Sequence, residues 1–196
     1  MSAELPENAL LAESRAVWRK WLQKNHARKE GVWLATYKKN SGKPHLDYGE
    51  AVEEALCFGW VDSKGQGLDG ERSMLWMAPR KARSNWARSN KLRVERLIAS
   101  GLMQPAGLAR VEEAKKNGSW TVLDEVEDTI VPADLVKALR ARPPAAKYFD
   151  EFPPGVKRGI LAWIASAKRE ETRSRRVEET AELAQKNVRA NEWKKP

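Results

Sequence analysis

Apolar residues recur with two different periods along the chain, and these periods predict where its helices and strands lie. Between residues 5 and 22 the spacing follows one face of a helix and ends before Asn25, which predicts an N-terminal helix. Residues 31–38 are instead rich in β-branched and aromatic side chains and are followed by an Asn-Ser-Gly cluster typical of turns. They therefore predict the first strand.

A short buried helix and two further strands are predicted next. Asp47 and Glu50 resemble a capping box, and the apolar helical face that follows them stops at Gly59. Residues 60–63 and 72–78 have the composition of strands. The segment 65–70 between them matches G-x-G-x-x-G, but the helix N-terminus that holds a pyrophosphate in that motif does not follow. The glycines therefore predict a hairpin loop.

The remainder of the chain has helical patterns. Residues 105–116 predict one helix, and residues 133–191, punctuated by two Pro-Pro pairs, predict three or four more. Before them, Ser84 is the expected N-cap of a helix that runs to Ala99. The expected inner face of that helix carries Trp86, Asn90, Val94, Leu97 and Ile98.

This order of elements predicts an α+β fold. A small, mainly antiparallel sheet packed with helices is expected in residues 1–131, followed by an all-α C-terminal module in residues 132–196. The boundary is placed after an acidic stretch that ends at Pro132. A chain of 196 residues is long enough for a sizeable core and a helical appendage.

The charge balance favours anionic partners. The net charge is +9, which concerns association rather than fold. The N-terminus has no apolar run of signal-peptide length, and no segment is long and apolar enough to predict a membrane span. A cytoplasmic protein is therefore expected. The sequence does not define an oligomeric state.

Signatures of catalysis and metal binding are absent from the sequence. The two histidines, His26 and His45, have no ligand spacing, and there is no P-loop or G-x-S-x-G motif. Cys57 is the single cysteine and is expected in the core. We therefore expect no cofactor and no metal, and a non-enzymatic protein, although catalytic groups assembled by the fold leave an enzyme for a small anionic substrate as an alternative.

One basic segment is the candidate anion site. Residues 79–96 contain seven cations and one anion, whereas residues 168–182 contain five of each at spacings that predict a self-paired helix. The first segment leads into the expected helix N-terminus, where free amides attract anions. The candidate ligand-binding residues are Arg80, Lys81, Ser84, Asn85, Asn90 and Asp62. In the alternative interpretation, these cations only solvate a surface helix that Trp86 anchors to the core.

Asp62 belongs to this set because it follows Trp60 in a segment expected to be buried. An interior carboxylate needs a partner, and Tyr37, Lys38, Arg72 and Arg80 lie on or beside the neighbouring strands. A role in binding a ligand is the alternative to such a pair. Nucleic acid is a second possible partner, but weak and nonspecific binding is expected, since only Trp86 is interleaved with these cations.

Several motifs carry a resemblance to a known family. They are the residues 57–62 (CFGWVD), 78–81 (APRK) with Ser84-Asn85-Trp86 and Asn90, and 101–107 (GLMQPAG), and in the C-terminal part 162–164, 167–169, 171–173 and Arg175-Arg176. The chain resembles the bacterial YdeI/OmpD-associated family, also labelled bacteriocin-protection proteins, over nearly its whole length. The resemblance implies a helical C-terminal module and a role in stress or bacteriocin tolerance, and supplies no catalytic residues. Together with the charge pattern, it predicts a binding protein for an anionic ligand or an acidic partner.

Overall fold

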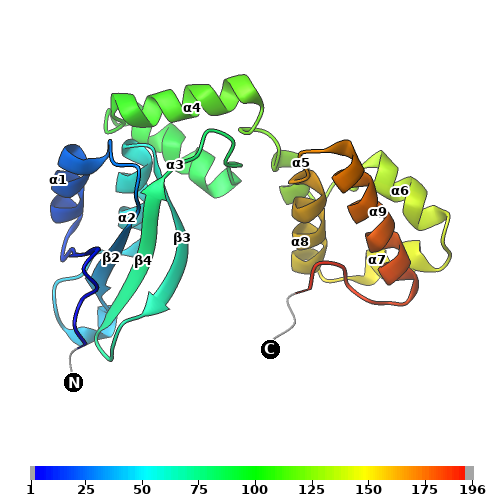
Figure 1. The fold of residues 1–196 in the computed structure, drawn as a ribbon, viewed down its shortest axis with the longest axis horizontal. Helices are drawn as coiled ribbons and strands as arrows, with labels where there is room; N and C mark the ends of the chain where they lie inside the picture. The colour runs from blue at the N-terminus through cyan, green and yellow to red at the C-terminus, as the bar shows by residue number, and fades with distance from the viewer. Residues whose placement is uncertain (1–2, 193–196) are drawn as a thin grey trace. The chain divides into compact units, whose positions relative to one another are not determined.

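The structure is a computed structural model, and it describes residues 3–192 (Figure 1). Packing divides the chain after Trp120 into two compact units. The expected α+β class is confirmed: the first unit holds a four-stranded sheet with helices, and the described residues of the second are helical. Residues 193–196, which the expected C-terminal module includes, lie outside the described residues.

The first unit is built around a sheet with strand order β1-β2-β4-β3. The parallel pair is β1 with β2, and the pairs of β4 with β2 and with β3 are antiparallel, so the expected mainly antiparallel sheet is confirmed. In Figure 1, α3 and α4 lie beyond one end of the strands. The elements are β1 (Ala9–Leu11), α1 (Arg15–Asn25), β2 (Val32–Tyr37), η1 (Lys39–Ser41), α2 (Tyr48–Cys57), β3 (Trp60–Gly67), β4 (Arg72–Pro79), α3 (Arg88–Ala99) and α4 (Pro105–Asn117).

The N-terminal helix is shorter than predicted. Residues 9–11 form β1, which pairs in parallel with β2, and the helix begins only at Arg15, where Ser14 Oγ accepts a hydrogen bond from the Val17 amide at 3.4 Å. The prediction of a helix from residue 5 is therefore wrong. The open edge of β2 supplies backbone partners to this short apolar run, and a pattern within the run cannot reveal them.

Strand β3 is also longer than predicted. It continues through Gly67, so two glycines of the G-x-G-x-x-G match lie in the strand and the connecting loop begins after them. The element after the glycines is strand β4, as expected for a hairpin. Between Asp62 and Gly65 the pairing shifts: two residues of β3 lie opposite Trp76 alone, as in a β-bulge.

Tryptophans form much of the core of the first unit. Trp18 and Trp60 are fully buried and meet edge to face at 6.4 Å between ring centroids. Their indole nitrogens donate to the carbonyl oxygens of Ala51 and His26, both at 3.0 Å. Each ring therefore buries its apolar surface and satisfies its polar atom, which fits the scaffold role that indoles have in protein cores.

Helix α4 packs closely against the end of α2. A Cβ atom built on Gly107 would lie 2.3 Å from the carbonyl oxygen of Cys57, so only glycine allows this approach. The Gln104 amide donates to the same carbonyl at 3.1 Å. Cys57 itself is a buried free cysteine, as expected, and burial raises the pKa of its thiol.

The second unit is a group of short helices around its own core. They are α5 (Asp124–Glu127), α6 (Ala133–Arg140), α7 (Ala145–Glu151), α8 (Pro154–Ala165) and α9 (Glu170–Gln185). Val126 of α5 packs into this core, which also contains Leu161 and Ile164. The division between units therefore falls before α5, earlier than the expected boundary at residue 131, because the acidic segment carries an apolar residue that needs burial.

Helix α9 is not paired mainly with itself, contrary to the prediction for residues 168–182. Arg173 Nε donates to Asp134 of α6 at 2.7 Å, and Arg176 donates to the Trp163 carbonyl and Ser166 Oγ beside α8. The prediction considered only pairs within one helix, whereas these guanidinium groups are long enough to reach neighbouring helices.

Candidate functional site

Arg80, the residue after β4, is the central side chain of the candidate site. It is 4 % exposed, and its guanidinium carbon lies 3.8 Å from the ring centroid of Trp86. Its Nη1 donates to the carbonyl oxygens of Asn85 at 3.0 Å and Ser84 at 3.4 Å. Trp86 is 2 % exposed, so the expectation that its indole points inward is confirmed.

The structure corrects the expected role of Ser84. Helix α3 begins at Arg88, its N-cap is Ala87, and no side chain caps it. The segment before it bends so that the Trp86 indole enters the core and meets Trp120 at 5.0 Å. The helix N-terminus that was expected to attract an anion at Ser84 is therefore not formed there.

The other predicted residues of this segment have different surroundings. Ser84 and Asn85 direct carbonyl oxygens at Arg80, and Lys81 is exposed. On α3, Val94 and Leu97 are buried as expected, but Ile98 is 46 % exposed. The helix starts later than predicted, and its buried residues are Lys91, Val94 and Leu97, so Ile98 lies to one side of its inner face.

Asp62 has a partner that the sequence interpretation did not consider. It lies on β3 opposite Met77, just before the bulge, and its Oδ2 accepts a hydrogen bond from the Tyr48 hydroxyl at 2.8 Å. Tyr48 is the first residue of α2. The signal in the sequence is weak, since an exposed tyrosine at a helix start has no feature that marks a pairing with a strand fourteen residues later.

The charges around Asp62 are coupled. Burial lowers the pKa of Arg80 to about 10, and the negative charge of Asp62 opposes that shift. Although Tyr48 is 58 % exposed, partial burial raises the pKa of its hydroxyl, and the hydrogen bond to Asp62 adds to the rise. The positive charge of Arg93 opposes this rise.

Arg93 and Asn90 complete the group from α3. Both are half-buried, and Arg93 Nη1 donates to Asn90 Oδ1 at 3.2 Å. We refer to Tyr48, Asp62, Arg80, Asn90 and Arg93 as the Arg80–Arg93 cluster. It brings together Asp62, Arg80 and Asn90 from the predicted set and adds Tyr48 and Arg93, which the sequence interpretation missed.

The two arginines of this cluster differ from Arg72 and Arg173, which have carboxylate partners. Within residues 3–192, neither Arg80 nor Arg93 forms an ion pair with a carboxylate. By contrast, Arg72 pairs with Asp69 at 2.6 Å, and Arg173 pairs with Asp134. In addition, Nε of Arg80 is buried without a hydrogen-bond partner. The cluster therefore has cationic groups whose charge and donors are incompletely satisfied.

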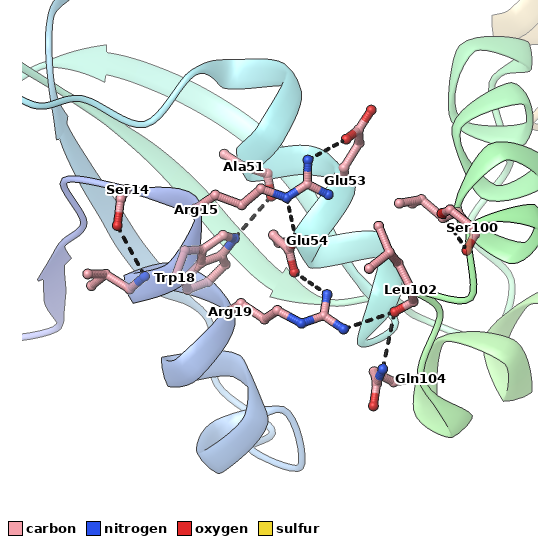
Figure 2. A network of polar contacts seen from close by, with 12 residues as sticks. Ser14, Arg15, Trp18, Arg19, Ala51, Glu53, Glu54, Ser100, Leu102 and Gln104 are labelled. Atoms are coloured by element: carbon pink, nitrogen blue, oxygen red, sulfur yellow. Dashed lines mark hydrogen bonds and ion pairs between the residues drawn. The ribbon is translucent and has the colours of Figure 1, made fainter.

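A second polar network, around Glu54, holds helices together (Figure 2). The Glu54 carboxylate is 1 % exposed and accepts from Arg15 Nε at 2.5 Å and from Arg19 Nη1 at 2.7 Å. Arg19 also donates to the Leu102 carbonyl at 3.0 Å. Both carboxylate oxygens are engaged, so this network joins α1 to α2 rather than offering a ligand site. In the sequence, this network could have been found from an acidic residue on the buried face of α2 and two arginines four residues apart on α1.

The described residues contain no group of His, Cys, Asp and Glu side chains that could hold a metal ion. Over the same part of the chain, none of the helices combines the length and the apolar character that crossing a membrane requires.

Two family models match this chain. Residues 10–110, about half of it, match a family described as "Domain of unknown function (DUF8412)". Residues 128–187 match the family described as "Bacteriocin-protection, YdeI or OmpD-Associated". No curated protein and no solved structure matches the chain. The first match contains all five residues of the Arg80–Arg93 cluster and the whole of α2, β3, β4 and α3. The second contains α6 to α9.

Proposed function

The chain belongs to the family of domain DUF8412 through residues 10–110, and its residues 128–187 match the YdeI/OmpD-associated, bacteriocin-protection family. From these matches and the Arg80–Arg93 cluster, we propose a role as a non-enzymatic binding protein for a small anionic ligand. The name of the second family supports a role in stress or bacteriocin tolerance. The cytoplasmic location remains a prediction from the sequence.

One observation carries the proposal: Arg80 is a buried guanidinium without a carboxylate partner. Burying a charge is unfavourable unless a counter-ion or hydrogen bonds compensate it. Two backbone carbonyls and the face of an indole compensate Arg80 in part, and Asp62 acts on it only from beyond ion-pair distance. An anion bound beside the cluster would supply the missing counter-charge, and Arg93 would add a second positive charge.

The Tyr48–Asp62 pair supports binding rather than acid–base catalysis. A raised pKa keeps the Tyr48 phenol protonated near neutral pH, so it is a hydrogen-bond donor and a poor base. Its proton is already directed at Asp62, which in turn has its negative charge balanced by the nearby guanidinium groups. The pair therefore has the character of a hydrogen-bonded contact between α2 and β3 that contributes negative charge near Arg80.

Thermal denaturation with added anions tests the proposal. At equal ionic strength, phosphate or sulfate is expected to raise the melting temperature of the wild type more than chloride does, because a ligand stabilises the folded state by RT ln(1 + [L]/Kd). Arg93→Gln, a change at a half-buried position, is expected to lose this anion-dependent rise. Arg175→Gln removes an exposed cation from the second unit and is expected to keep it.

Two outcomes contradict the proposal: a wild type that responds equally to all three anions, and a rise in melting temperature that survives in Arg93→Gln.

Nucleic acid, the second candidate partner, is distinguished by the salt dependence of its binding. If nucleic acid binds through residues 79–96, the logarithm of the binding constant would fall linearly with the logarithm of salt concentration, with a slope of about −0.9 for each duplex phosphate contacted.

A further inference from the structure

A cavity of about 570 Å³ lies in the first unit between the sheet and the segment that contains η1 and the start of α2. Its volume is within the range of about 300–1,000 Å³ that is usual for small-molecule sites. Apolar residues form much of its wall, among them Leu34, Leu46, Ala51 and Leu75. Its polar groups include Lys38, Lys39, His45, Tyr48 and Gln66.

The strand register explains why this space is open. Leu34 and Thr36 of β2 lie opposite Leu75 and Ser73 of β4, so these four side chains share one face of the sheet. On the other side of β4, Leu75 pairs with Gly65, which has no side chain to fill the space beside it. The small side chain of Ser73 and the absence of a side chain at Gly65 thus leave space over the apolar surface of Leu34 and Leu75.

The segment that covers the cavity is held in place by the sheet. The Leu46 amide donates to Thr36 Oγ1 at 2.9 Å, and the Leu46 side chain is 2 % exposed. This hydrogen bond holds Leu46 against Thr36 of β2, ten residues earlier in the chain, and so fixes the distance between the covering segment and the sheet. The cavity is therefore a built feature with an anchored wall.

Positive charge prevails among the lining residues. Lys38 Nζ donates to the carbonyl oxygens of Asp69 at 2.7 Å and Gly70 at 3.1 Å, which orient the ammonium group without neutralising it. Lys39 is exposed. Asp47 is the single carboxylate among the residues that line the cavity, and it lies 3.5 Å from His45.

From this combination we propose that the cavity binds a small amphipathic anion, an aromatic or aliphatic carboxylate whose apolar body lies on Leu34 and Leu75 and whose carboxylate meets Lys38 and Lys39. This site goes beyond the anion site at the Arg80–Arg93 cluster. The two have one residue in common, since the side chain of Tyr48 lines the cavity and its hydroxyl binds Asp62.

The test uses 2-naphthoate as the probe, with isothermal titration calorimetry for affinity and amide chemical shifts for location. The full chain is expected to bind 2-naphthoate, with the largest shifts at residues 34–39, 45–51 and 73–75. Acetate, which has the charge without the apolar body, is expected to bind at least about tenfold more weakly, because apolar burial supplies most of the affinity.

Two variants and a control locate the site. Ser73→Trp fills the cavity and is expected to weaken 2-naphthoate binding at least about tenfold. Lys39→Gln is expected to weaken it about threefold, as for the loss of an exposed charge pair. Gln23→Trp adds the same ring on the exposed face of α1 and should leave the affinity unchanged.

Shifts centred elsewhere, equal affinities for acetate and 2-naphthoate, or wild-type affinity in Ser73→Trp would each overturn the proposal. If Ser73→Trp does not fold, the wild-type shift map and Lys39→Gln still decide it. Arg93→Gln is expected to bind 2-naphthoate as the wild type does. The experiments therefore distinguish failure of the cavity proposal from failure of the anion site at the Arg80–Arg93 cluster.

Discussion

Replacing Glu54 by Gln tests whether the buried ion-pair network holds the first unit together. The change keeps the size of the side chain and removes its charge, leaving Arg15 and Arg19 without the carboxylate that both contact. Breaking a buried ion pair by removing one partner usually costs about 3–5 kcal/mol, because the other charge stays buried and unpaired.

The side chains of the two arginines are 32 % and 23 % exposed, so water can solvate them in part after the change. Arg15 also keeps Glu53 at 3.0 Å, and Arg19 keeps the Leu102 carbonyl. These remaining contacts reduce the expected loss in the free energy of unfolding to about 2–3 kcal/mol, below the range for a fully buried pair.

Urea denaturation followed by tryptophan fluorescence is the appropriate measurement, because seven of the nine tryptophans belong to the first unit. Urea is uncharged and leaves ion pairs unscreened, unlike guanidinium chloride. Glu95→Gln, at an exposed position of α3, is the matched control and is expected to change the free energy of unfolding by less than about 0.5 kcal/mol. A Glu54→Gln loss no larger than that of the control would refute the reasoning.

Three further changes test other parts of the structure. Trp86→Ala should lower the free energy of unfolding by about 3–5 kcal/mol in urea, because the ring is buried beneath Arg80; an unchanged midpoint would contradict its place in the core. Gly107→Ala should lower the melting temperature, since its Cβ would collide with the Cys57 carbonyl. The Arg72 guanidinium lowers the pKa of Asp69, so this carboxylate stabilises the fold above the ordinary aspartate pKa and less as the pH falls below about 4. Asp69→Asn should therefore flatten the decline of the melting temperature with pH in that range, and a decline as steep as that of the wild type would exclude this role.

Local sequence patterns were sufficient to predict a helix or strand where its own residues determine its structure. The strand at residues 31–38, the helix at 105–116 and the helical C-terminal part were predicted close to their observed bounds, since periodicity and turn residues act over a few neighbouring positions. The inward direction of Trp86 was also predicted correctly. The charge of the segment after β4 drew attention to Arg80 for the same local reason.

The sequence by itself thus determined the α+β class, most helices and strands, and the region in which Arg80 lies. Only the tertiary structure decided that residues 9–11 form a strand, that α3 starts at Arg88, and that Tyr48 is the partner of Asp62. Each of these depends on atoms distant in the chain: the open edge of β2, the space for the Trp86 indole, and a hydroxyl on another element. A hydrogen bond or packing contact between distant segments has no period in the sequence, so it becomes visible only when the fold brings its two partners together.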